Sequence, residues 1–170
     1  MITVDVTNAQ TSLPVQSRPL QRAVRMVLKD ASIARAKISV AVVDDRTIAQ
    51  LHEKYLQDSD PTDVLSFVLE ASAGYLEGEV IVSAEMAAAM APRFGWSAAD
   101  ELLLYVIHGT LHLVGHDDST PRQAVEMRAR QQAYLARFGL GRKGEGHKGT
   151  RAQRHKGTKA QRRVKRFGGP

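Results

Sequence analysis

His108 and His112 are the residues of this chain whose type and spacing can hold a metal ion. On a helix, positions i and i+4 lie on the same face, so both imidazoles can reach one ion. Gly115 follows, and glycine can end a helix in the left-handed conformation. Beyond it come His116 and Asp118, either of which can turn back to supply a third ligand. Three protein ligands leave one position of a tetrahedral Zn²⁺ open to water, which indicates hydrolysis.

The residue after the first histidine indicates which class of hydrolase the motif belongs to. The pattern H-x-x-x-H-x-x-G-x-x-D resembles the zinc-protease motif, with its helix-ending glycine and a third ligand beyond it. Those proteases place a glutamate directly after the first histidine, where it acts as general base. Gly109 stands at that position here. The pattern therefore favours a metallohydrolase of another kind, and a peptidase is the weaker alternative.

Three blocks of the sequence resemble the YbeY family of bacterial endoribonucleases. Residues 108–115 (HGTLHLVG) resemble the start of the family pattern H-G-x-L-H-L-x-G-[YH]-D-H. Residues 61–67 (PTDVLSF) resemble P-T-[DN]-V-L-S-F, and residues 78–83 (GEVIVS) resemble G-D-I-x-I-S. The order and spacing of the blocks also agree, and the resemblance extends over roughly residues 1–138.

The resemblance implies a single-strand-specific, metal-dependent endoribonuclease that acts in 16S rRNA 3′-end maturation and ribosome quality control. Its partners would be single-stranded RNA, ribosomal RNA and the small ribosomal subunit. The family's third metal ligand is a histidine at the position of Asp118. We therefore expect one Zn²⁺ on His108, His112 and Asp118, with His116 as the alternative third ligand. A carboxylate ligand leaves the ion less positive than an imidazole does, so it should acidify the bound water less.

A second departure from the family concerns phosphate binding. The family has an arginine after a tyrosine upstream of the 61–67 block, whereas here Tyr55 is followed by Leu56. If that arginine binds substrate phosphate, another cation must replace it, and Arg46, Lys54 and the basic C-terminal segment are candidates. The general base and the attacking nucleophile are not identified by the sequence. The missing arginine keeps open a non-catalytic ribosome-assembly or RNA-binding factor that zinc merely stabilises.

Charge is distributed unevenly along the chain, which has a net charge of +6. Residues 1–140 carry 13 Lys and Arg against 17 Asp and Glu, whereas residues 141–170 carry 11 Lys and Arg against one Glu. We therefore expect a metallohydrolase domain over 1–140 and a basic tail over 141–170. The tail contains a tandem repeat, HKGTRAQR and HKGTKAQR, and is too poor in apolar residues to form a core, so it should be disordered when unbound. It is either an arm for RNA or ribosome, or a solvated segment of little consequence.

Composition indicates the compartment. The chain has no cysteine, which excludes disulfides and thiolate metal sites and does not suggest an oxidising compartment. The N-terminus lacks the charged and apolar regions of a signal peptide. No apolar run approaches the roughly 18 residues of a membrane span. A cytoplasmic protein without a membrane partner is expected.

The hydrophobic pattern predicts an α+β fold, with a single mixed four-stranded sheet packed with about five helices and the metal site on a buried central helix. Apolar residues on most sides of the segment after Ser97 place that helix at the centre. His52 is expected at the surface of its helix, and Asp63 could orient a metal-binding histidine or cap a turn. Strands are expected over residues 2–6 (an edge strand), 37–43, 64–69 and 79–83. Helices are expected after a Ser17 cap, from Asp44 or Asp45 to about Gln57, over residues 84–93, after Ser97, and from Thr120 to Gly139.

Overall fold

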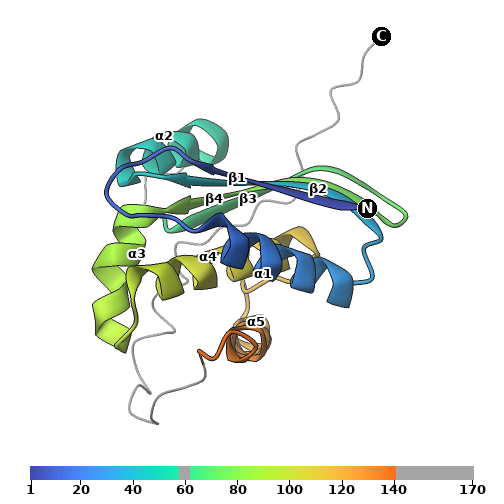
Figure 1. The fold of residues 1–170 in the computed structure, drawn as a ribbon. Helices are drawn as coiled ribbons and strands as arrows, with labels where there is room; N and C mark the ends of the chain where they lie inside the picture. Colours follow the sequence, from blue (N-terminus) through green and yellow to red (C-terminus); the bar gives the residue numbers. More distant parts are fainter. Residues whose placement is uncertain (58–61, 141–170) are drawn as a thin grey trace.

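A four-stranded sheet in the order β1-β2-β4-β3 organises the molecule (Figure 1). The computed structural model describes residues 1–57 and 62–140. Residues 58–61 and the predicted basic tail at 141–170 lie outside the described residues. β1 and β2 run parallel, β2 and β4 run parallel, and β3 is antiparallel to β4, which confirms the mixed sheet and the edge position of the first strand. The strands are β1 (Ile2–Asn8), β2 (Arg35–Val43), β3 (Val64–Ser72) and β4 (Tyr75–Ser83).

Helices cover both faces of the sheet. α2 lies on one face, α1 and α4 lie on the other, and α5 lies beyond α4 (Figure 1). This arrangement confirms the predicted α+β fold with five α-helices in the described chain. Within that part of the chain, no helix is both long enough and apolar enough to cross a membrane. The helices are α1 (Ser17–Asp30), α2 (Asp45–Leu56), α3 (Ala84–Met90) with its 3-10 extension Ala91–Phe94, α4 (Ala98–Leu113) and α5 (Pro121–Ala136).

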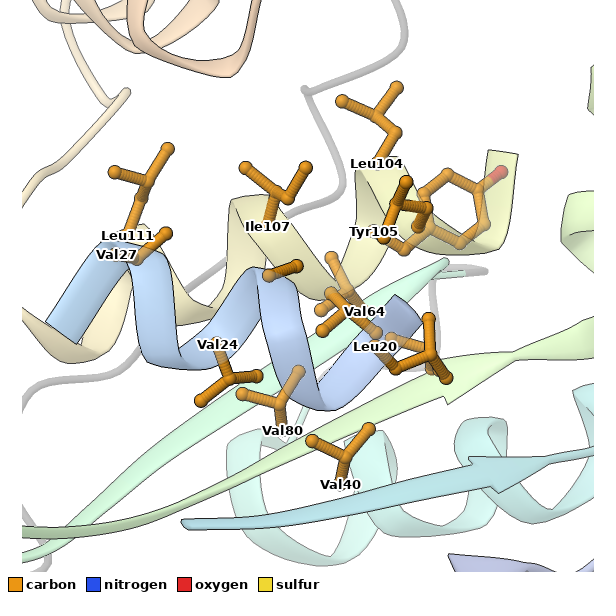
Figure 2. Packing of buried hydrophobic residues seen from close by; sticks show 14 of the residues in the cluster. Leu20, Val24, Val27, Val40, Val64, Val80, Leu104, Tyr105, Ile107 and Leu111 are labelled. Carbon is orange, nitrogen blue, oxygen red and sulfur yellow. The ribbon is translucent and has the colours of Figure 1, made fainter. Parts of the chain in front are cut away.

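The central helix is α4, whose residues from Glu101 to Leu113 are all buried. It contacts α1, α3 and α5 as well as strands β3 and β4, which a helix with apolar side chains on most sides requires. Figure 2 shows Ile107 and Leu111 of α4 beside Val24 and Val27 of α1, in one cluster with valines of the sheet. Each such side chain contributes about 1.5–3 kcal/mol by leaving water. The predicted metal helix is therefore held rigidly by its own core residues.

Both α4 and α5 begin with a capping box. In α4 the Oγ of Ser97 accepts from the N–H of Asp100 at 3.1 Å, and the Asp100 carboxylate accepts from the N–H of Ser97 at 3.0 Å. In α5 Thr120 and Gln123 make the same reciprocal pair. An N-cap side chain of this kind stabilises a helix by about 1 kcal/mol. The two caps fix the residue at which each helix begins.

Three local predictions are wrong. Ser17 does not cap α1, because it is already helical and Gln16 occupies the cap position without a side-chain bond. His52 is fully buried and not at the surface, because it lies on the face of α2 that packs against the protein. The last two strands are longer than predicted and form a hairpin, which turns through Gly74 at φ +70°.

Candidate metal centre

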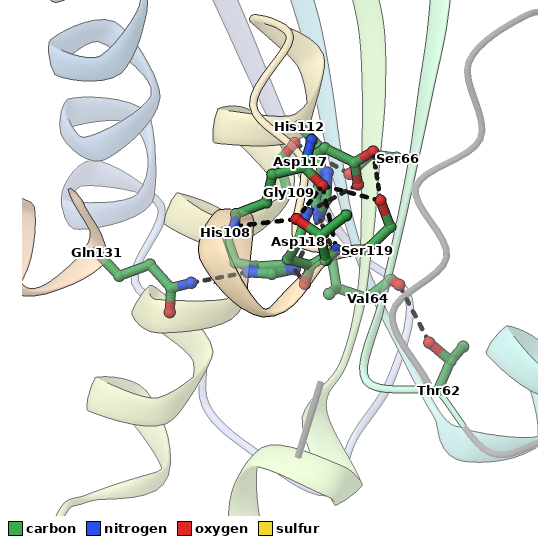
Figure 3. A network of polar contacts seen from close by, with 12 residues as sticks. Thr62, Val64, Ser66, His108, Gly109, His112, Asp117, Asp118, Ser119 and Gln131 are labelled. Carbon is green, nitrogen blue, oxygen red and sulfur yellow. Dashed lines mark hydrogen bonds and ion pairs between the residues drawn. The ribbon is translucent and has the colours of Figure 1, made fainter. Parts of the chain in front are cut away.

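The side chains of His108, His112 and Asp118 converge at the C-terminal end of α4 (Figure 3). The two histidine Nε2 atoms are 3.0 Å apart. Oδ2 of Asp118 is 3.6 Å from Nε2 of His108, and Oδ1 is 3.5 Å from Nε2 of His112. Ligand atoms around a tetrahedral Zn²⁺ with bonds of about 2.0–2.1 Å are separated by similar distances. Among the described residues, these three form the group of His, Asp and Glu side chains that could hold one ion.

The helix supplies the two imidazoles in fixed positions. His108 is 1% exposed and His112 is 8% exposed, and their rings meet edge to face with centroids 4.6 Å apart. Their backbone belongs to the most buried part of the fold, so little conformational freedom remains to be lost when they bind a ligand. The i, i+4 spacing read from the sequence thus brings both Nε2 atoms to one point. That they bind a metal stays a prediction.

A Schellman turn ends α4 and reverses the chain toward the histidines. Gly115 adopts φ +97°, a conformation that a residue with a Cβ rarely takes. Its N–H donates to the carbonyl of His112 at 3.0 Å, and the N–H of His116 donates to the carbonyl of Leu111 at 3.0 Å. These two bonds define the motif and satisfy carbonyls at the helix end. The glycine singled out in the sequence therefore serves as the predicted helix terminator.

Asp117 shapes the loop, and Asp118 points into the centre. The N–H of Asp118 donates to Oδ1 of Asp117 at 2.7 Å, and the hydroxyl of Ser119 donates to Oδ2 of Asp117 at 3.1 Å. With its neighbour held in this way, the Asp118 side chain is only 5% exposed and faces both imidazoles. Asp117 therefore stabilises the turn by hydrogen bonds, whereas Asp118 contacts the two histidines.

His116, the alternative third ligand, is not in this group of three. Burial lowers the pKa of its imidazole, Arg130 lowers it further, and Glu126 partly opposes them. Both charged residues belong to α5. The His116 side chain therefore lies in the electrostatic environment of α5, whereas the Asp118 carboxylate lies beside the two histidines.

The electrostatics of the cluster suit a bound cation. The pKa of Asp118 is raised to about 6, mainly by burial and also by the negative charges of Asp117 and Asp63. Burial also lowers the pKa of His112 to about 4, which leaves its imidazole neutral at pH 7. Oδ2 of Asp118 is buried without a hydrogen-bond partner among the described residues. A divalent metal ion requires a deprotonated carboxylate and a neutral imidazole as ligands. Asp118 and His112 are in these states at pH 7, so the three side chains fit a divalent ion.

Gly109 contacts the sheet so closely that no side chain fits there. A Cβ at this position would lie 2.6 Å from Cγ1 of Val80, 2.9 Å from Oγ of Ser66 and 3.0 Å from Cγ2 of Val64. The Ser66 hydroxyl also donates to the Gly109 carbonyl at 3.0 Å, which ties β3 to α4. The position at which zinc proteases carry their glutamate base therefore faces β-sheet side chains. The absence of that base has a steric cause in this fold.

Leu56 takes part in packing at the position where the family has an arginine. It is half-buried at the end of α2 and packs against an apolar cluster on that face of the sheet. Of the candidate replacement cations, Arg46 is exposed in the first turn of α2. Lys54 is also exposed, with Nζ 5.2 Å from the centre of the Tyr55 ring. The apolar cluster consists of Val43, Ile48, Leu65 and Ile81.

Sequence reasoning missed Gln131, which contacts the centre from α5. Its Nε2 lies 2.9 Å from Nδ1 of His108, and the residue is 1% exposed. The available signal was its place between Met127 and Leu135, each four residues away, on the buried stripe of α5. A polar residue within an apolar stripe indicates a buried partner, although it does not identify that partner.

Comparison with known proteins places these features in one family. The family model described as "Endoribonuclease YbeY" matches residues 5–139. The chain is 42% identical over 108 residues to the endoribonuclease YbeY of Rhodopirellula baltica, a match that covers 62% of this chain and 56% of that protein. It is 38% identical over 153 residues to that of Moorella thermoacetica, which covers 81% of this chain and 97% of the relative. The solution structure of TM1509 from Thermotoga maritima is similar with a TM-score of 0.54 and 25% identity, over 87% of this chain and 99% of that one.

Proposed function

Because the chain belongs to the YbeY endoribonuclease family, we propose that it cleaves single-stranded RNA with one Zn²⁺ held by His108, His112 and Asp118. The observation that carries this proposal is the convergence of three buried donor atoms within 4.8 Å of one another. Imidazole and carboxylate are both zinc ligands, and three of them leave a position for the reaction. The two imidazoles suit Zn²⁺ better than they suit Mg²⁺ or Ca²⁺.

Each part of the centre has a task in hydrolysis. When bound, the ion would lower the pKa of a water molecule and polarise the phosphodiester. Helix α4 presents the two imidazoles from a rigid core, and the low pKa of His112 keeps that ring unprotonated. Asp118 adds a negative charge where a third histidine would add none, so we expect the reaction to require a higher pH than a three-histidine centre does. Gly109 keeps α4 against the sheet.

The test is cleavage of an end-labelled single-stranded RNA by the zinc-loaded protein. We expect cleavage by the native protein and by His116→Ala, and a loss of at least about 100-fold in His112→Ala, because that variant lacks a ligand. Zinc content should fall in Asp118→Ala and persist in His116→Ala, and the reverse result would make His116 the third ligand. A 2′,3′-cyclic phosphate product would identify the RNA 2′-hydroxyl as the attacking group and exclude direct attack by water.

We also propose a cytoplasmic role in 16S rRNA 3′-end maturation and ribosome quality control, with the small subunit as partner. Family membership supports this role, and so does the net charge of +10 over residues 141–170. Lysine and arginine that neutralise phosphates release counterions, so binding should weaken with salt at a slope of about −0.7 per phosphate contacted on single strands. Deleting the tail should flatten this slope, and an unchanged slope would remove the tail from the proposal.

A second candidate function is a non-catalytic ribosome-assembly or RNA-binding factor that zinc stabilises. The observation that favours it is Leu56, which packs against the apolar cluster of Val43, Ile48, Leu65 and Ile81 at the position where the resemblance implies an arginine. A native protein that binds zinc and ribosomes but does not cleave RNA would favour this candidate. Recovery of cleavage in Leu56→Arg would then attribute the lost activity to that one side chain.

A further inference from the structure

Gln131 reaches from α5 to the back of the His108 imidazole (Figure 3). Nε2 of Gln131 and Nδ1 of His108 are 2.9 Å apart, and both residues are 1% exposed. The other buried residues of α5, Met127 and Leu135, are apolar. Burying an amide in such a stripe costs free energy unless it is hydrogen-bonded, so this contact is the reason that a glutamine can occupy the position.

The contact bears on which nitrogen of His108 carries the proton. A neutral imidazole has one N–H, and its other nitrogen has a lone pair. Nε2 of His108 faces His112 and Asp118, so it must be unprotonated to bind a cation there. The proton must then reside on Nδ1, which needs an acceptor behind the ring. Gln131 is the side chain at that position.

A glutamine can meet both requirements without moving its backbone. In the described arrangement its NH₂ group faces Nδ1, which suits a ring that carries its proton on Nε2. A half-turn of the amide places Oε1 at the same position, and this oxygen accepts from Nδ1–H. The second arrangement leaves the Nε2 lone pair available. The amide can therefore match either tautomer of His108.

We propose that Gln131 is a positioning residue for the metal centre, whose Oε1 accepts from Nδ1–H of His108 when the ion is bound. This inference rests on the proposed metal centre and adds a partner behind the ligands. The hydrogen bond fixes the tautomer and the orientation of the ring, and it links α5 to the centre. Partners of metal-binding histidines typically change metal affinity by about 10–100-fold when they are removed.

The test measures Zn²⁺ affinity by chelator competition in the full chain. Gln131→Met keeps the length of the side chain but removes the acceptor, so affinity should fall about 10–100-fold. Gln131→Glu keeps an acceptor, so it should bind Zn²⁺ at least as tightly as the native protein. Gln132→Met is the matched control, because it makes the same change one residue along α5 and should leave affinity unchanged.

Each outcome separates positioning from packing. Native affinity in Gln131→Met, or weaker binding in Gln131→Glu, would overturn the proposal, and thermal unfolding of the metal-free variants would show whether the residue merely packs. If Gln131→Met does not fold, the isosteric Gln131→Glu still decides the question. Native protein that binds no Zn²⁺, or that binds it no more tightly than His112→Ala, would instead refute the metal centre itself.

Discussion

Helices α4 and α5 have the same length, 16 residues, and both begin with a capping box, yet the fold holds them in different ways. In α4 the 13 consecutive residues from Glu101 to Leu113 are buried. In α5 only Met127, Gln131 and Leu135 are buried, at intervals of four residues along one stripe. The two histidines belong to the first helix, and Gln131 belongs to the second. Asp118 lies in the connection between them.

The centre therefore joins a rigid helix, α4, to a helix with few buried residues, α5. Segments with few buried apolar contacts open at lower free energy than the core does. A ligand that binds only the assembled arrangement stabilises it in proportion to its affinity. An ion held by α4 and by the connecting loop would therefore stabilise mainly the loop and α5. Metal binding and the placement of α5 should be coupled.

Truncating an apolar side chain should give the largest difference in unfolding free energy between α4 and α5. Leu111 of α4 is 1% exposed, so Leu111→Ala should lower the free energy of unfolding by about 2–5 kcal/mol through lost burial and a cavity. Val125 of α5 is 57% exposed, and Val125→Ala should change the free energy of unfolding by less than about 0.5 kcal/mol. Urea denaturation of the two variants measures both. Equal losses would show that α5 depends on packing as much as α4 does.

Zinc should protect α5 from hydrogen exchange, although few residues of this helix are buried. When the free Zn²⁺ concentration is about 100 times the dissociation constant, binding stabilises the folded state by about 2.7 kcal/mol. Amide exchange through openings that release the ion should then be roughly 100-fold slower. We expect this protection in residues 114–136, because an opening of the loop or of α5 would release the ion, and we expect it to be absent in His112→Ala. Exchange of native protein and His112→Ala, each with and without Zn²⁺, measures the effect. Unchanged exchange over residues 114–136 when Zn²⁺ is added to the native protein would contradict the coupling.

Adding a methyl group to α4 and removing one from α5 should have different effects on Zn²⁺ binding. Gly109→Ala places a Cβ within 3.0 Å of side chains on β3 and β4, so the contacting strands or α4 must move, at a cost of about 1–3 kcal/mol. The reverse exchange at an exposed position of α5, Ala133→Gly, should cost about 1 kcal/mol through helix propensity alone. Only the first change should also weaken Zn²⁺ binding, because it displaces the backbone that carries His108. A fully stable Gly109→Ala variant would show that the sheet yields at this point.

Much of α4 was predictable because its determinants are local. The Ser97 and Asp100 cap, the apolar run and the helix-ending Gly115 are all read from neighbouring residues. The convergence of His108 and His112 follows from helix geometry alone. The burial of His52 was missed although this residue lies four positions after the buried Ile48 on the same face of α2, because a histidine is as common at a helix surface as in a core.

The rest of the centre depends on contacts that the sequence pattern does not encode. Whether His116 or Asp118 faces the histidines is decided by the Schellman turn and by the bond from the Asp118 N–H to Asp117. Gln131 is 23 residues from His108, and only the packing of two helices brings them together. Such pairings require the three-dimensional arrangement, which is why Asp118 could be favoured only through a family resemblance and Gln131 was missed.

The smallest effect that we predict concerns the loop between the helices in the absence of metal. Because burial holds the pKa of Asp118 at about 6, above its usual value of 3.8, folding must keep an ionised carboxylate out of water at neutral pH. A raised pKa contributes stability that is present below about pH 4 and is lost as the pH rises through about 6. Asp118→Asn removes this titration, so the metal-free variant should match the native protein near pH 4 and exceed it by about 1–2 kcal/mol at pH 8.

The measurement is urea denaturation in a chelator across this pH range. His112 contributes in the opposite sense, since its stabilisation rises with pH between about 4 and 6.5. At pH 8 its imidazole is neutral in both proteins, so the difference measured there isolates Asp118. Added Zn²⁺ should reverse the order at pH 8, because only the native protein can bind it with all three ligands. A native protein that is the more stable of the two at pH 8 without metal would mean that some other group already neutralises Asp118. The loop would then be fixed without an ion, and metal binding could not be what couples α5 to α4.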